Sequence, residues 1–156
     1  MACVNKYILK KFLNFLKDNS IAFENNDSWN FRYLCYKFNY FIKHIPLPKI
    51  KKNNFYEAVF IDFRILPNIE FIIRNAILKL GKKWSFTIVC GNLNYSFIKN
   101  IIKDLDNNIN IIRLDCNNVS QQEYSNLLTT QKFWNMFNGE KLLIFQEDTL
   151  IFHNNI

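Results

Sequence analysis

Acidic residues stand directly after short apolar runs at several points of the sequence, and their types and spacing suit metal or phosphate chemistry. Glu147 and Asp148 follow the run 142–145 through Gln146, and Asp62 follows 55–61. Beside a nucleoside diphosphate, such carboxylates require a hard cation, Mg²⁺ or Mn²⁺, to bridge the negative charges. The alternative interpretation is that each carboxylate is a solvated residue at the end of a strand.

From residue 55 onward, strand-like and helix-like segments alternate. The strand-like runs are 55–62, 84–90, 109–114 and 142–145, and the helix-like segments between them are 69–80, 97–105 and 124–134. The three glycines, Gly81, Gly91 and Gly139, fall at the boundaries of these segments. Apolar strands separated by amphipathic helices predict an α/β fold, a mostly parallel, Rossmann-like sheet with helices on both faces.

In an open parallel sheet, ligands bind at the carboxyl ends of the strands. The polar residues at the four predicted ends are Asp62 and Arg64, Gly91 and Asn92, Asp115, and Gln146 to Thr149. We therefore expect these groups to gather along one edge of the sheet.

The first third of the chain differs in charge and pattern. An apolar stripe at 8–16 and an aromatic-rich segment at 29–43 predict two helices, and Pro46 and Pro48 follow them. We expect residues 1–54 to be a basic helical extension and linker, and residues 55–156 to be the α/β domain.

The net charge of +7 lies in the first third. Residues 1–55 contain ten lysines and arginines against three acidic residues, whereas residues 56–156 contain ten of each. We therefore expect no nucleic-acid-binding face on the α/β domain. The basic helix at 5–17 predicts either packing on the domain or a weak contact with a membrane surface or an anionic partner.

Several classes of protein are disfavoured by the sequence. No uncharged apolar run is long enough to span a membrane, and the N-terminus does not resemble a secretory signal. The cysteines are widely spaced, and His44 and His153 have no neighbours at metal-ligand spacing. We expect reduced cysteines, no transmembrane segment and a cytoplasmic protein.

Five blocks of sequence carry a resemblance to a known family. They are Ala58–Arg64, Asn75–Gly81, Val89–Tyr95, Phe133–Trp134 and Gly139–Thr149. In this order they resemble the glycosyltransferase-like proteins of giant DNA viruses related to mimivirus, which carry the domain of unknown function DUF5672. The resemblance covers about residues 55–156, and for a viral protein it implies the cytoplasm of the infected host cell.

The resemblance implies the nucleotide-binding half of a glycosyltransferase-A-type fold that uses a nucleotide-diphosphate sugar as donor. By the same resemblance, Asp148, with Glu147, would hold Mn²⁺ or Mg²⁺ at the donor diphosphate, and the metal would act as a Lewis acid. Asp62 and Arg64 match the block that contacts the nucleotide. At the other predicted strand ends we expect Gly91, Asn92 and Asp115 to bind the donor.

The similar proteins continue past this motif into an acceptor-side segment, and no residue of this chain is assigned as the catalytic base. We therefore expect a donor-binding half, truncated before the acceptor half, that transfers no sugar alone. The alternative hypothesis is a non-catalytic interaction or scaffold protein with a Rossmann-like fold.

Overall fold

The computed structural model describes residues 28–153 of the chain, which fall into two compact units. The sheet unit consists of Lys49–Ile65 and Gly81–Gln146. The helical unit consists of Leu66–Leu80 together with residues 28–48 and 147–153. The helix predicted around the apolar stripe at 8–16 lies outside the described residues, and the boundary expected after residue 54 stays a prediction.

The sheet unit is built on four parallel strands in the order β3-β2-β1-β4. The strands are β1 (Tyr56–Ile61), β2 (Trp84–Cys90), β3 (Ile109–Arg113) and β4 (Lys141–Phe145). The central strands β1 and β2 are almost entirely buried, whereas the edge strands β3 and β4 are mostly half-buried. The near-continuous apolar runs correctly predicted the parallel sheet, because a strand covered on both faces has no polar face.

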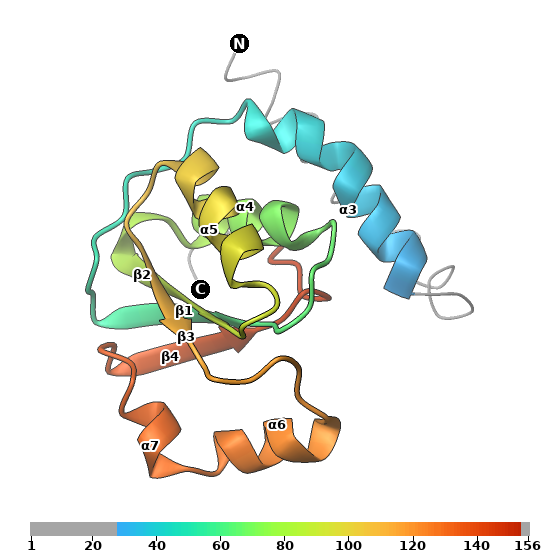
Figure 1. Cartoon of the computed structure of the whole chain (residues 1–156). Coiled ribbons are helices and arrows are strands. Elements are labelled where there is room, and N and C mark those ends of the chain that lie inside the picture. The colour runs from blue at the N-terminus through green and yellow to red at the C-terminus, as the bar shows by residue number, and fades with distance from the viewer. Residues whose placement is uncertain (1–27, 154–156) are drawn as a thin grey trace. The chain divides into compact units, whose positions relative to one another are not determined.

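Helices of the sheet unit lie on both faces of the sheet. Figure 1 shows α5 (Tyr95–Leu105) on one side and α6 (Gln121–Leu128) with α7 (Gln131–Trp134) on the other. Phe133 is fully buried in the core cluster on the α6–α7 side. On that side the strands contribute Val59, Ile61, Val89, Leu142 and Ile144. The α/β fold with helices on both faces is therefore confirmed.

The region expected to form one helix between 124 and 134 forms two. Helix α6 ends at Leu128, and the hydroxyl of Thr130 accepts a hydrogen bond from the backbone N–H of Phe133 at the start of α7. A threonine side chain that caps a new helix competes with continuation of the previous one. The indole N–H of Trp134 then donates to the carbonyl of Leu128, 2.7 Å away, and joins the two helices.

A buried glutamate fastens the loop before β4 to the sheet. The carboxylate of Glu57, on β1, accepts hydrogen bonds from the hydroxyl of Thr87 and from the backbone N–H groups of Asn138 and Gly139, at 2.8 and 2.7 Å. Gly139 approaches so closely that an added Cβ would lie 2.5 Å from the Cβ of Glu57. The loop that leads into β4 therefore depends on a glycine at this position.

The helical unit pairs α3 (Ser28–Lys43) with α4 (Ile69–Leu80) through Glu70. Its carboxylate accepts hydrogen bonds from Asn39 and Arg74 and pairs with Lys43, all at 2.9–3.0 Å. Burial by itself raises the pKa of Glu70, but the hydrogen bonds from Asn39, Lys43 and Arg74 outweigh it and lower the pKa. The carboxylate is therefore ionised at neutral pH and joins the two helices.

A segment near the C-terminus is joined to α4 by an asparagine. The carboxamide of Asn75 donates to the carbonyl of Ile151 and accepts from its N–H, at 3.2 and 2.9 Å. Asn75 is fully buried, so both contacts are shielded from water. Across residues 28–153, no helix is both long and apolar enough to cross a membrane.

Replacing Gly139 with alanine tests the close approach to Glu57. The added methyl group meets the Cβ of Glu57, so we expect Gly139→Ala to lower the free energy of unfolding by about 1–3 kcal/mol. Urea unfolding of this variant beside Glu140→Ala, a change at the exposed neighbouring position, measures the effect. Equal stability of the two variants would contradict the proposed steric constraint.

Candidate functional site

The carboxyl ends of the four strands are aligned at one edge of the sheet. Across the parallel pairs, Phe60 lies opposite Phe145, Ile61 opposite Val89, and Cys90 opposite Arg113. The loops that follow the strands therefore start side by side. This confirms the predicted gathering of strand ends for the sheet unit, which includes Asp62, Gly91, Asp115 and Gln146.

A cleft of about 540 Å³ opens at this edge within the sheet unit. One wall is Ile61–Arg64 after β1, the other is Asn118–Gln121 with Tyr124 and Ser125 of α6, and Gln146 follows β4. In the order β3-β2-β1-β4, the chain steps outward from β1 to β3 and then returns to the other side of β1. The cleft therefore lies where the strand order reverses, the usual ligand site of open α/β sheets.

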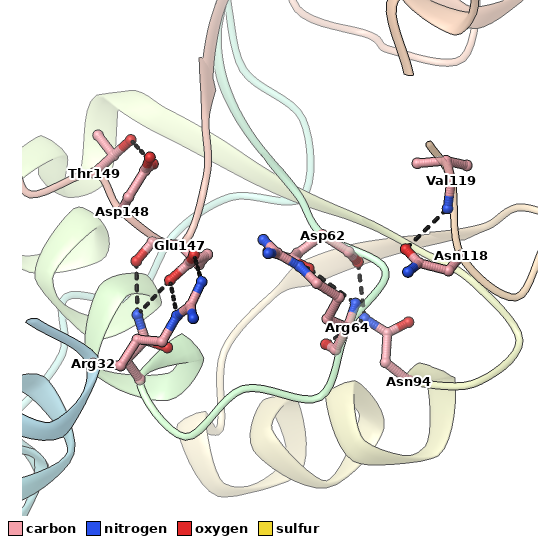
Figure 2. A network of polar contacts seen from close by, with 10 residues as sticks. Arg32, Asp62, Arg64, Asn94, Asn118, Val119, Glu147, Asp148 and Thr149 are labelled. Carbon is pink, nitrogen blue, oxygen red and sulfur yellow. Dashed lines mark hydrogen bonds and ion pairs between the residues drawn. The ribbon is translucent and has the colours of Figure 1, made fainter. Parts of the chain in front are cut away.

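Asp62 and Arg64 form a compact ion pair in the first wall (Figure 2). The Asp62 carboxylate accepts from the backbone N–H and Nε of Arg64 at 2.9 and 3.0 Å, and from Nη2 at 2.8 Å. The Asp62 side chain is 2% exposed and that of Arg64 is 47% exposed. Two parallel hydrogen bonds join the Asp62 carboxylate to the Arg64 guanidinium. This bidentate geometry fixes the orientation of the guanidinium at the cleft.

The side chain of Asn94 stabilises this wall of the cleft through hydrogen bonds to its backbone. Asn94 was not predicted from the sequence as a site residue. Its carboxamide donates to the carbonyls of Asp62 and Arg64 at 2.8 and 3.1 Å, and Figure 2 shows it beside them. Its oxygen accepts from the N–H of Gly91 at 2.9 Å. The only sequence signal is an asparagine three residues after the glycine that ends a strand, which by itself indicates no more than a turn.

The other predicted donor-binding residues do not line the cleft. Gly91 packs beneath the loop after β3, where an added Cβ would lie 2.6 Å from the carbonyl oxygen of Cys116. Asn92 donates to Asp115 at 3.0 Å and accepts from Arg113 at 2.8 Å. These residues order the ends of β2 and β3, and their assignment to donor binding stays a prediction.

The second wall carries the start of α6. Ser120 and Glu123 form a reciprocal capping box, in which the serine hydroxyl accepts from the Glu123 N–H and the glutamate accepts from the Ser120 N–H. The Ser120 backbone N–H, followed by its hydroxyl, lowers the pKa of Glu123. The pattern Ser-x-x-Glu at 120–123 is the sequence signal that could have placed this helix start at the site.

The thiols near the strand ends are not suited to nucleophilic chemistry. Burial raises the pKa of Cys90 to about 11, although Arg113 opposes the shift. Burial, followed by the charges of Asp115 and Glu123, raises the pKa of Cys116. Because a thiolate is the reactive form, both cysteines remain protonated and unreactive at neutral pH. Neither Cys90 nor Cys116 therefore fits the role of a nucleophile.

Residues 108–156 match the family model of DUF5672, described as a protein of unknown function. The match contains β3, α6, α7, β4 and the motif from Gln146 to Thr149. The match confirms the DUF5672 part of the expected resemblance, from residue 108 onward. Asp62 and Arg64 precede the matched segment. No curated protein and no solved structure matches the chain.

Glu147 lies within the DUF5672 segment and belongs to the helical unit. Both oxygens of its carboxylate accept hydrogen bonds. Arg32 on α3 donates from Nε to one carboxylate oxygen at 3.0 Å and from Nη2 to the other. Asn68 donates to the Glu147 side chain at 3.0 Å and to its carbonyl at 2.7 Å. With Glu147 only 5% exposed, these contacts anchor the segment after β4 to α3 and to the start of α4. Figure 2 shows Arg32 beside Glu147.

Asp148, the next residue, is exposed to solvent, whereas Glu147 is buried. One oxygen of Asp148 accepts from the Thr149 hydroxyl at 3.5 Å. In the described part of the chain, no three His, Cys, Asp or Glu side chains come together as a metal site. Because both oxygens of Glu147 already accept from Arg32, the pair does not fit a two-carboxylate metal site, whereas Asp148 alone fits a single ligand.

Removing the charge of Glu147 tests its structural role. We expect Glu147→Gln to lower the free energy of unfolding by about 3–5 kcal/mol, because it leaves the buried Arg32 guanidinium without its carboxylate. The matched control is Asp148→Asn, an exposed substitution expected to change stability by less than about 0.5 kcal/mol. Thermal unfolding in EDTA compares them, and equal melting temperatures would show that the ion pair is not structural.

Proposed function

We propose that this chain is a glycosyltransferase-like domain that binds the nucleotide part of a nucleotide-diphosphate sugar. The observation that supports this most directly is the cleft between the loops after β1, β3 and β4, at the reversal of strand order. Its volume of about 540 Å³ falls within the usual range of small-molecule sites. The class of ligand comes from the resemblance to giant-virus glycosyltransferase-like proteins, because the DUF5672 model itself describes no function.

The charges of the cleft suit a diphosphate. Arg64 donates to Asp62 from Nε and Nη2, and its guanidinium, with five N–H donors in all, is of the planar kind that matches phosphate oxygens. The start of α6 lies on the opposite wall, where the positive end of the helix dipole favours an anion, and its capping box already uses the N–H groups of Ser120 and Glu123. Asp62 contributes indirectly, because its buried carboxylate orients Arg64.

Titration with nucleoside diphosphates tests the cleft. We expect UDP or GDP to bind the full chain in calorimetry, and Arg64→Gln to weaken the affinity about tenfold or more because a charged hydrogen bond to phosphate is lost. The matched control is Arg113→Gln, which removes an exposed arginine at the end of β3 that does not line the cleft. Equal losses in the two variants would locate binding elsewhere or reduce it to net charge.

For the metal, we propose that Asp148 supplies the carboxylate for Mn²⁺ or Mg²⁺ in the bound state. When bound, the cation would neutralise the diphosphate and act as a Lewis acid. We expect diphosphate affinity to rise when Mn²⁺ replaces EDTA, and Asp148→Ala to remove that rise while leaving the metal-free affinity unchanged. Glu147→Asp is not a suitable control because it disturbs the Arg32 pair, so the exposed Glu140→Ala is used. Identical affinities in Mn²⁺ and EDTA would exclude the role of Asp148.

A second candidate function, a non-catalytic interaction protein with a Rossmann-like scaffold, is favoured by one feature of α3. Tyr33, Tyr36 and Tyr40 are each more than half exposed and share one side of the helix at its natural spacing. Exposed aromatic residues that gather on one face are typical of interaction surfaces. The same calorimetry separates the two functions, because a scaffold would bind neither UDP nor GDP under any metal condition.

A further inference from the structure

Asn94 occupies a helix-capping position but does not use its side chain for capping. It is the residue before α5, and its backbone carbonyl accepts from the N–H of Ile98 at 2.9 Å. Asparagine is favoured at this position because its side-chain oxygen normally accepts from the first turn of the helix. Here no side-chain capping bond forms. The carboxamide points away from its own helix, toward the loop after β1.

The hydrogen bonds of the Asn94 carboxamide hold the loop after β1 in one conformation. Both of its donor contacts are made to backbone carbonyls of the same wall, those of Asp62 and Arg64, and its oxygen accepts from Gly91. Asn94 is fully buried, so water cannot replace these partners. Two carbonyls two residues apart are held by one planar group, which fixes the turn that aims the Arg64 side chain.

The same residue connects to the opposite wall of the cleft. Gly91, which donates to Asn94, packs against the loop after β3 at the carbonyl of Cys116. The N–H of Asn92 donates to that carbonyl at 2.6 Å, and the N–H of Leu114 donates to Cys90 at 2.8 Å. This loop runs on into Asn118 and Ser120, which line the cleft. A continuous set of contacts, made by the Asn94 side chain and then by the backbone at Gly91 and Asn92, therefore links the two walls.

We propose that Asn94 is the positioning residue of the cleft, which sets the spacing of its two walls and thereby the affinity for a nucleoside diphosphate. The inference rests on the proposed function for the identity of the ligand. The positioning itself rests on the contacts of Asn94 in the free protein. Asn94 touches no ligand in this role and acts through Arg64 and the start of α6.

The experiment compares Asn94→Ala and the milder Asn94→Ser with Asn75→Ala in the full chain. Asn75 is a matched control, since it is also a fully buried asparagine that hydrogen-bonds backbone, at Ile151 in the helical unit. Amide hydrogen exchange of residues 62–65 and 116–120 in the ligand-free protein measures how readily the backbone of each wall opens. Calorimetry with UDP and GDP reports affinity, and urea unfolding reports global stability.

We expect both Asn94 variants to exchange faster in the two walls and to bind the diphosphate about tenfold more weakly, because a displaced guanidinium loses its phosphate contacts. The serine variant keeps one donor, so its losses should be the smaller. Asn75→Ala should lose stability but retain wild-type exchange in the walls and wild-type affinity.

Two results would overturn the inference. One is a folded Asn94 variant whose walls exchange at the wild-type rate and whose affinity for UDP or GDP is that of the wild type. If Asn94→Ala does not fold, Asn94→Ser is the variant to which this result applies. The other is an equal loss of affinity in Asn75→Ala, which would assign the effect to global stability. If the wild-type chain binds neither UDP nor GDP, the proposed function fails, and the exchange rates alone decide whether Asn94 holds the walls.

Discussion

The parallel pairing of β1 with strands on both of its sides is the constraint on which the candidate site depends. β1 pairs with β2 over its whole length and with β4 over five residues, all in parallel. Parallel strands place their carboxyl ends at the same edge, so the loops after β1, β2, β3 and β4 have to share one small region. Because β4 returns to the far side of β1, a cleft opens between these loops.

Buried polar side chains then fix the loops that the sheet brings together. Glu57 holds the loop before β4, Asn94 holds the loop after β1, and Asn75 and Glu147 hold the segment that follows β4. A buried carboxamide or carboxylate is tolerated only when its hydrogen bonds are made, so each of these residues specifies one arrangement of the backbone around it. With only three glycines in the chain, loop shape here depends on side-chain contacts as much as on backbone freedom.

Glu147 and Asp148 show how adjacent residues of one acidic motif diverge. Glu147 is enclosed by Arg32 and Asn68, and Asp148 is exposed to solvent. A carboxylate that already accepts two bonds from a guanidinium has little capacity left for a cation. Glu147 therefore has a structural role, and Asp148 is the residue of the motif to which we assign the proposed metal.

The sequence by itself determined the α/β fold, the strands almost to the residue, and the edge at which polar groups collect. It did so because burial on both faces leaves continuous apolar runs, and because parallel strands have only one carboxyl edge. Only the tertiary structure separated Asp62 and Arg64, which line the cleft, from Gly91, Asn92 and Asp115, which do not. It alone showed that Asn94 aims away from its helix and that Arg32 reaches Glu147, 115 residues along the chain. Such contacts depend on side-chain direction and on long-range packing, and neither leaves a periodic signal in the sequence.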